Sequence, residues 1–211
     1  MGNLLTAVLA IVSGWVLGLF SEPVRQRIFG PRLELVFENT EHFVTPTKEV
    51  GPPGSLHMAL FVRVKVTNVK WALAKACRAY LVNVERLGSS NQFEATEYCE
   101  SLQLAWSAHK EEERYGPLDL PRQVPQFVDV VSTRDSEKDA FRLEIAFTPF
   151  RFRRLLSTRG TYRLTILVSG DGVRPEQIQL CFTWSGTWND VKVSPSEKEA
   201  SAARETGAAP A

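Results

Sequence analysis

The stretch HMALFVRVKVTN (57–68) decides the fold of this 211-residue chain. Apolar side chains alternate along it with His57, Arg63, Lys65 and Thr67. A β-strand places successive side chains on opposite faces of a sheet, and helical spacing cannot produce this alternation. The stretch therefore predicts a strand with one apolar face. That face consists of Met58, Leu60, Val62, Val64 and Val66.

Further segments of the same kind lie on both sides of this strand, without a helical pattern between them. The predicted strands are 32–37, 57–68, 76–86, 101–108, 126–132, 140–147, 161–170 and 176–184. The turn SGDGVRP (169–175) joins the last two as a hairpin, and the Pro- and Gly-rich stretch 45–55 is predicted to be a loop. Eight or nine short strands predict an all-β fold, an antiparallel β-sandwich over residues 32–193.

Two of these strands have a predicted inward face. In 76–86 the face consists of Ala76, Tyr80, Val82 and Val84. In 176–184 it consists of Ile178, Leu180, Phe182 and Trp184. Both faces follow from the two-residue period of a strand.

The first twenty residues differ from the rest of the chain, because residues 4–20 carry no charge. A helix of that length spans roughly 25 Å, at the short end of what crosses a bilayer. The opening Met-Gly-Asn has no basic residue and no small-x-small site follows Phe20, which argues against a cleaved signal peptide. The run is apolar on every face, which suits lipid better than a partly exposed core helix. We predict a transmembrane helix over 1–20, with the signal peptide and the core helix as alternatives.

Basic residues after this run predict its orientation. Arg25, Arg27 and Arg32 lie on the C-terminal side, in or beside a juxtamembrane stem over 21–31. The positive-inside rule places them in the cytoplasm, against lipid headgroups. An odd number of cysteines, three, agrees with a reducing compartment. We expect a single-pass inner-membrane protein with its N-terminus outside and its domain cytosolic.

Small residues recur every four positions in the predicted helix. Ala10, Gly14 and Gly18 lie on one stripe, which predicts a homodimer through close helix packing. The alternative is that such spacing is common by chance in membrane helices. At the other end of the chain, residues 194–211 contain no Ile, Leu, Val or aromatic residue and are predicted to be disordered.

Two segments of the domain are candidate interaction surfaces. In 148–163 Phe and Leu residues interleave with arginines, namely Arg151, Arg153, Arg154 and Arg159. This pattern predicts a basic surface for anionic lipid or an acidic partner, or instead a core crossover whose arginine stems cover the apolar residues. Trp184 and Trp188 are a candidate aromatic platform for a sugar or peptide, although Trp184 also continues the inward face of its strand.

The sequence carries no pattern typical of catalysis. There is no Gly-x-Ser-x-Gly turn and no phosphate-binding glycine loop, and the cysteines and His109 lack the spacing of a zinc site. We therefore predict no catalytic, metal or cofactor residue. With 25 basic and 24 acidic residues the formal charge is +1, which argues against nucleic acid as a partner.

Two stretches resemble immunoglobulin-like domains of prokaryotic proteins. The segment 60–85 is similar to their opening hairpin, in which a strand ends in Val-Thr-Asn and the next begins with small residues. The stretch GTYRLTILVSGD (160–171) resembles their Gly-x-Tyr-x-Leu-x-Val strand, which implies that Tyr162 is a tyrosine-corner residue. Leu164 stands where antibody domains have a core cysteine. The layout is similar to a group of single-pass prokaryotic membrane proteins, and this resemblance implies fold and topology alone.

These observations predict a membrane-anchored interaction or sensing module without catalytic activity. Its expected partners are membrane lipid, a protein whose identity the sequence does not give, and a second copy through the anchor helix. The alternative is a periplasmic or surface ligand-binding domain held by an uncleaved signal anchor.

Overall fold

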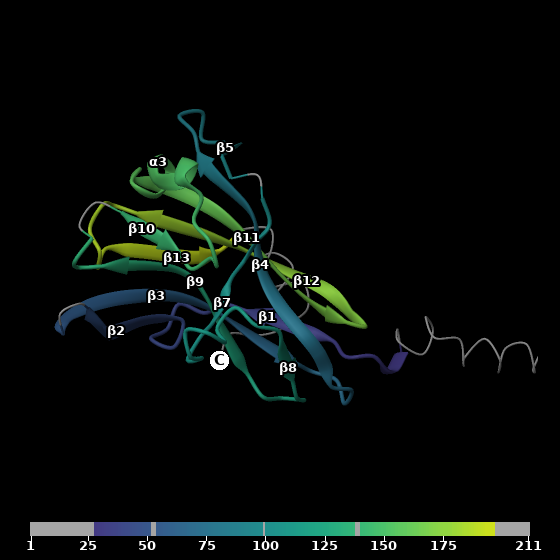
Figure 1. The fold of residues 1–211 in the computed structure, drawn as a ribbon. Helices are drawn as coiled ribbons and strands as arrows, with labels where there is room; N and C mark the ends of the chain where they lie inside the picture. Colours follow the sequence, from purple (N-terminus) through teal and green to yellow (C-terminus); the bar gives the residue numbers. More distant parts are fainter. Residues whose placement is uncertain (1–27, 52–53, 99, 138–139, 197–211) are drawn as a thin grey trace, which may run out of the picture.

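The structure is a computed structural model that describes residues 28–51, 54–98, 100–137 and 140–196. Thirteen strands, one 3-10 turn and one short α-helix make up this part of the chain (Figure 1). All ladders between strands are antiparallel, so the prediction of an all-β protein with antiparallel sheets is confirmed. No helix within these residues is both long and apolar enough to cross a membrane. The predicted anchor over 1–20 lies outside them.

The first sheet has β3 and β9 at its centre. Its strand order is β1 (Leu33–Val36), β3 (Ser55–Asn68), β9 (Gln126–Arg134) and β10 (Phe141–Leu143). Two more strands join it, β2 (Val44–Gly51) on β3 and β7 (Ala105–Trp106) on β9. β9 pairs with one side of β3, and β1 and β2 pair with different halves of its other side. Both β1 and β2 therefore lie at the same edge of this sheet.

The second sheet is built on two long hairpin strands and β4. Its strand order is β13 (Val191–Pro195), β12 (Val173–Trp184), β11 (Gly160–Asp171), β4 (Ala74–Leu87) and β5 (Phe93–Ala95). Two short strands, β6 (Leu102–Gln103) and β8 (Leu118–Leu120), also pair with β4. Before β11 the chain forms the 3-10 turn η1 (Phe150–Phe152) and the helix α3 (Arg153–Leu156). The predicted β11–β12 hairpin is present, with its turn at Gly172.

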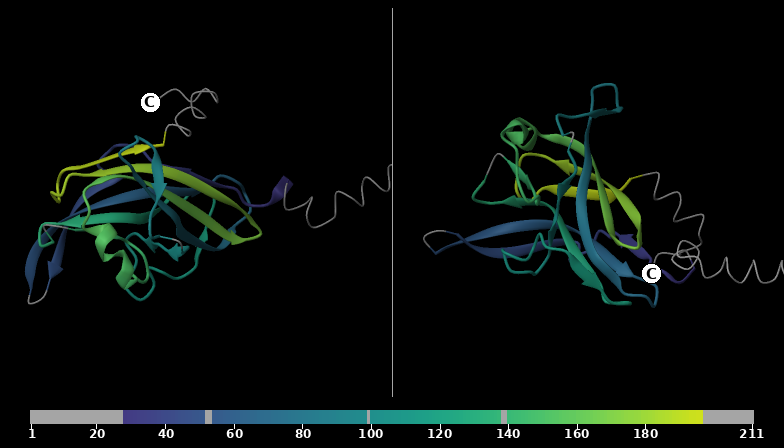
Figure 2. Two further views of the ribbon diagram at one scale, coloured as in Figure 1. Left: turned by 90° about the horizontal axis from the view of Figure 1, so that it is seen from above. Right: turned by 45° about the vertical axis from the view of Figure 1, so that its right-hand side comes forward.

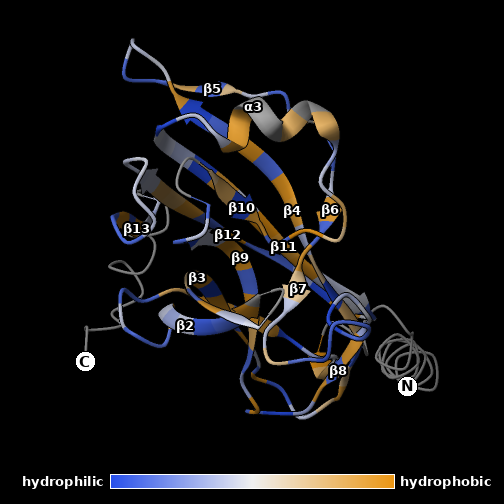
Figure 3. Ribbon diagram, turned by 60° about the vertical axis from the view of Figure 1, so that its left-hand side comes forward, coloured by the Kyte–Doolittle hydropathy of each residue, from blue (hydrophilic) through white to orange (hydrophobic). Residues whose placement is uncertain are grey.

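One apolar core joins the two sheets (Figure 3). Phe141 of β10 contacts three rings of the second sheet, at centroid distances of 5.2 to 5.4 Å, from Tyr162, Phe182 and Trp184. The predicted inward face of β12 is confirmed, because all four of its residues are at most 5% exposed. Aromatic rings in tilted and edge-on contact therefore fill the space between the sheets.

The predicted apolar faces of β3 and β4 need correction. In β3 the valines at 62, 64 and 66 are buried, but Met58 and Leu60 are only half-buried, where β3 forms a hairpin with β2. In β4 the inward residues are Cys77, Ala79, Leu81 and Val84. The prediction was wrong for Ala76, Tyr80 and Val82. Thr165 and Ile166 are consecutive in β11, but they lie opposite Asn83 and Leu81 in β4. Val82 is therefore an extra residue, a β-bulge, and it reverses the alternation of the side chains before it.

Four strands of the structure are not among the predicted ones, namely β2, β5, β8 and β13. The segment of β2 was expected to be a loop because it contains Pro46 and borders further Pro and Gly residues. A proline is tolerated in an edge strand, where its missing N–H need not join a ladder. The same holds for Pro195 at the end of β13, the edge strand that pairs with β12.

Strand β3 runs the length of the domain. Its fourteen residues span about 43 Å at roughly 3.3 Å per residue. The β2–β3 hairpin lies at one end of the molecule, and the chain enters at Ile28 at the other (Figures 1 and 2). The two ends can therefore contact different partners.

Candidate functional site

Six charged side chains of alternating sign lie in a row on the face of the first sheet that is opposite to the core. We call them the charged row; in order they are Arg63, Asp129, Arg114, Glu144, Arg134 and Glu49. Successive N–O distances along the row are 2.8, 3.9, 2.9, 3.5 and 2.7 Å. The row joins β3, β9 and β2 to the segments that follow β7 and β10. With three guanidinium groups and three carboxylates, its formal charge is zero.

The two carboxylates inside the row are buried, and each accepts hydrogen bonds from one serine and at least one arginine. Asp129 is 5% exposed and Glu144 is 6% exposed. The Ser107 hydroxyl donates to Asp129 Oδ1 at 2.5 Å, and the Ser132 hydroxyl donates to Glu144 Oε1. Burial raises the pKa of Asp129, although the Ser107 hydrogen bond and the charge of Arg63 act against this increase. The neighbouring arginines therefore offset the cost of burying these two carboxylates.

Arg134 is the most strongly held cation of the row. Its guanidinium donates to both oxygens of Glu49, at 2.7 and 3.1 Å, and lies 3.5 Å from Glu144 Oε1. Burial alone would lower the pKa of Arg134, but the two glutamates raise it on balance. Arg63 and Arg134 also each place their guanidinium carbon 5.5 Å from the ring centroid of Phe61, which is 6% exposed. The arginines thus cover an aromatic side chain on the outer face of the sheet.

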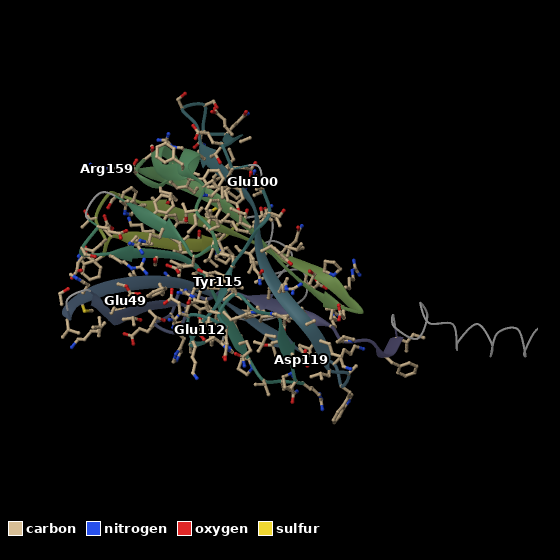
Figure 4. All side chains as sticks on the ribbon, in the orientation of Figure 1. Glu49, Glu100, Glu112, Tyr115, Asp119 and Arg159 are labelled. Atoms are coloured by element: carbon tan, nitrogen blue, oxygen red, sulfur yellow. The ribbon has the colours of Figure 1, made fainter. Side chains whose placement is uncertain are left out.

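At its Glu49 end the charged row lines an open cleft of about 1290 Å³. The walls come from the β2–β3 hairpin, the β9–β10 connection, the loop at 111–115 and the segment that leads to α3. Glu49 and Tyr115 mark the hairpin side and the loop side of this region in Figure 4. His57, Arg142 and Glu137 add further charged or titratable groups, and Arg142 pairs with Glu137. The cleft therefore presents both signs of charge.

Exposed apolar side chains lie in or next to the segments that line the cleft, and we call them the apolar rim. They are Val50, Leu56, Phe147 and Phe150, which are 75%, 68%, 68% and 77% exposed. Val50 lines the cleft and lies opposite Leu56 in the hairpin, and Thr148, beside Phe147, lines it too. Large apolar side chains gathered around a polar recess are typical of surfaces that contact other proteins.

Three residues at the hairpin have the identities of a hydrolytic triad. Ser55 Oγ lies 2.7 Å from His57 Nε2, and His57 Nδ1 lies 3.6 Å from Asp135 Oδ1. The second distance exceeds that of a hydrogen bond, and the side chains of His57 and Asp135 are each one-third exposed. Asp135 Oδ2 accepts the Met58 backbone N–H at 3.0 Å. This arrangement fastens the hairpin to the turn after β9, and it could not be predicted from sequence because Asp135 is distant in the chain.

The predicted basic surface is in part a core segment. Arg151 lies in η1, Arg153 and Arg154 lie in α3, and Arg159 is exposed just before β11. The apolar residues between them are buried, with Phe152 0%, Leu155 7% and Leu156 8% exposed. This burial agrees with the core-crossover interpretation of the segment.

The predicted aromatic platform is not formed by two exposed indoles. Trp184 is 2% exposed and packs against Phe141, whereas Trp188 is half-buried at the surface. Of the residues expected at the membrane, Arg32 is exposed just before β1. Ala10, Gly14, Gly18, Arg25 and Arg27 lie outside the described residues.

Within the described residues no three His, Cys, Asp or Glu side chains are grouped as metal ligands. Cys77 is buried in β4, and burial raises the pKa of its thiol to about 11. Strand β11 separates it from Cys181 of β12. The chain matches no model of a known protein family, and no curated protein matches its sequence.

Proposed function

We propose that the chain is a membrane-anchored, non-catalytic interaction module, which presents an immunoglobulin-like β-sandwich at the cytosolic face of the inner membrane. The observation that carries the proposal is the charged cleft with its apolar rim. It lies at the β2–β3 end of the domain, where His57 lines it about 36 Å along β3 from Asn68, near the end at which the chain enters.

The lining of the cleft favours a polypeptide as the partner. Its guanidinium groups already pair with carboxylates, so a small anion would have to displace a glutamate to bind. A polypeptide with both signs of charge can exchange these pairs for new ones and place apolar side chains on the rim. A volume of about 1290 Å³ also exceeds the ~300–1,000 Å³ typical of small-molecule sites.

Two features support an immunoglobulin-like sandwich. Tyr162 is fully buried, and its hydroxyl donates to the backbone carbonyl of Thr158 and lies 3.3 Å from that of Leu155, a few residues upstream, as in a tyrosine corner. In addition, β1, β3 and β9 have the positions of strands A, B and E, and β4, β11 and β12 have those of C, F and G. The topology differs at β10, which has the position of strand D but follows strand E in the chain.

Site-specific photo-crosslinking in cells tests the interaction. A photoreactive residue would replace Leu56 or Phe147 on the rim, and Gln177, exposed on β12, would serve as the matched control position. We expect one discrete protein adduct at both rim positions and none at 177. Absence of an adduct at the rim, or equal adducts at all three positions, would overturn the proposal.

The side of the membrane needs a separate measurement. A membrane-impermeant thiol reagent would be applied to intact and to permeabilised cells that contain the Gln177→Cys variant. We expect this exposed position to be labelled only after permeabilisation. Labelling of intact cells would instead favour the periplasmic alternative.

A further inference from the structure

A second group of exposed apolar side chains lies at the end where the chain enters the domain. We call it the terminal patch. Its members are Ile28 (45% exposed), Phe29 (68%), Val69 (37%), Trp71 (82%), Leu73 (41%) and Val124 (43%). Together with the apolar rim, these residues account for all the large hydrophobic side chains that are exposed in the described residues. Trp71 is the most exposed of them.

Asn68 holds the segments of the patch together. Its side chain is buried and donates to the carbonyls of Ala72 and Leu120, at 2.7 and 3.0 Å. Its amide oxygen accepts the Lys70 N–H at 3.1 Å, and its backbone carbonyl accepts the Gln123 N–H at 2.8 Å. The loops at 69–73 and 121–124 are therefore fixed relative to each other by hydrogen bonds. Their exposed apolar side chains lie on held segments of the chain.

The entering chain is joined to the same structure. The Val69 N–H donates to the Arg32 carbonyl at 2.9 Å. Arg32 follows Ile28 and Phe29 by only a few residues, so the patch continues from the β3–β4 loop to the first described residues. The patch thus surrounds the point at which the N-terminal segment meets the domain.

The charged residues of the patch are mainly basic. Lys70 and Arg32 are exposed, and the Arg122 guanidinium lies 3.5 Å from the Trp71 ring centroid. The nearby carboxylate of Asp119 accepts the Ala76 backbone N–H at 2.8 Å. An exposed indole with neighbouring basic side chains has the chemistry that is enriched where proteins meet lipid headgroups.

The sequence limits how far the patch can be from the predicted anchor. The uncharged run ends at Phe20, eight residues before Ile28. Eight residues span at most about 29 Å when fully extended. We propose that the terminal patch inserts Trp71 and its apolar neighbours into the interface of an anionic membrane, so that the domain docks on the bilayer that holds its anchor. This inference rests on the proposed function, which makes residues 4–20 a membrane anchor.

Lipid crosslinking of the full-length chain in vesicles tests this docking. A photoreactive aromatic residue would replace Trp71, and the same residue at Phe150, which is similarly exposed on the apolar rim, is the matched control. The vesicles would contain phosphatidylglycerol and phosphatidylcholine. We expect lipid adducts at 71 and not at 150. With Lys70 and Arg32 both changed to Gln, the lipid adduct should fall roughly threefold or more, because each basic residue contributes to binding an anionic surface.

Alkaline extraction of the same vesicles separates the two proposals. Release of the chain would show that residues 4–20 do not anchor it, which overturns the proposed function. Retention of the chain with no lipid adduct at 71 would overturn the docking inference alone. Adducts at 71 to a second copy or to another protein would overturn it as well, because they assign the patch to a protein contact.

Discussion

Glu144→Gln is the substitution that tests the charged row most directly. Glu144 lies between Arg114, whose guanidinium is 2.9 Å away, and Arg134, at 3.5 Å. The change keeps the size of the side chain and removes its charge. Both arginine side chains are largely buried, at 20% and 11% exposure, so each would lose a carboxylate in a place that water reaches poorly.

The size of the effect follows from this burial. Removal of one partner of a buried ion pair costs about 3–5 kcal/mol. Arg134 retains its two hydrogen bonds to Glu49, and Arg114 retains Asp129 at 3.9 Å. The lower end of that range therefore applies, and we expect a loss of about 3 kcal/mol in the free energy of unfolding.

Urea denaturation of the full-length chain in detergent, followed by tryptophan fluorescence, measures this loss. With a slope of roughly 2–3 kcal/mol/M, the midpoint should fall by about 1 M. Glu137→Gln is the matched control in the same cleft, because its partner Arg142 is 52% exposed. We expect that variant to lose less than about 1 kcal/mol. Equal losses for both variants would refute the argument that burial sets the strength of the row.

Three further predictions concern the core. Burial raises the pKa of the Cys77 thiol from its ordinary value of 9.0 to about 11, so roughly 3 kcal/mol of stability should be lost as pH rises between these values. Cys77→Ala should reduce the loss of stability over this range in urea titrations, and an unchanged loss would contradict the prediction. Tyr162→Phe removes the hydroxyl that donates to the Thr158 carbonyl and should cost about 1–2 kcal/mol, measured as a lower urea midpoint; an unchanged midpoint would argue against the tyrosine corner. A Cβ at Gly170 would lie 2.6 Å from the Lys75 carbonyl oxygen, so Gly170→Ala should lose roughly 1–3 kcal/mol; Gly88→Ala, which meets only the flexible Glu94 side chain, is the control and should lose less.

The strands with regular alternation were predictable from sequence because local period alone determines them. β12 is the clearest case, since its inward residues repeat every second position without interruption. The predicted inward face of β4 is wrong because a single inserted residue, Val82, reverses the alternation. Such a bulge depends on the register with β11, which local sequence does not determine. β2 was missed because an edge strand tolerates Pro46, a residue that otherwise indicates a loop.

The charged row was not predictable as a site, because its members come from five separate segments that only the folded sheet brings together. A local signal did exist in two of them. Asp129 interrupts the apolar stretch QFVDVVS, and Glu144 interrupts AFRLEIAF. A carboxylate inside a strand of this kind needs a buried cation, and the sequence did not reveal which of 25 basic residues provides it.

The prolines of the outermost strands affect how copies of this domain behave when they are crowded. Pro46 lies in β2 and Pro195 in β13, each in a strand with no further partner on its outer side in the described sheets. Lys48 and Lys192 lie in the same two strands. An edge strand with a missing N–H and a charged side chain is a poor template for a strand from another molecule. The β2 edge of the first sheet and the β13 edge of the second are thus protected against growing into a continuous ladder, and contacts between copies at these two edges are directed to side chains instead of the backbone.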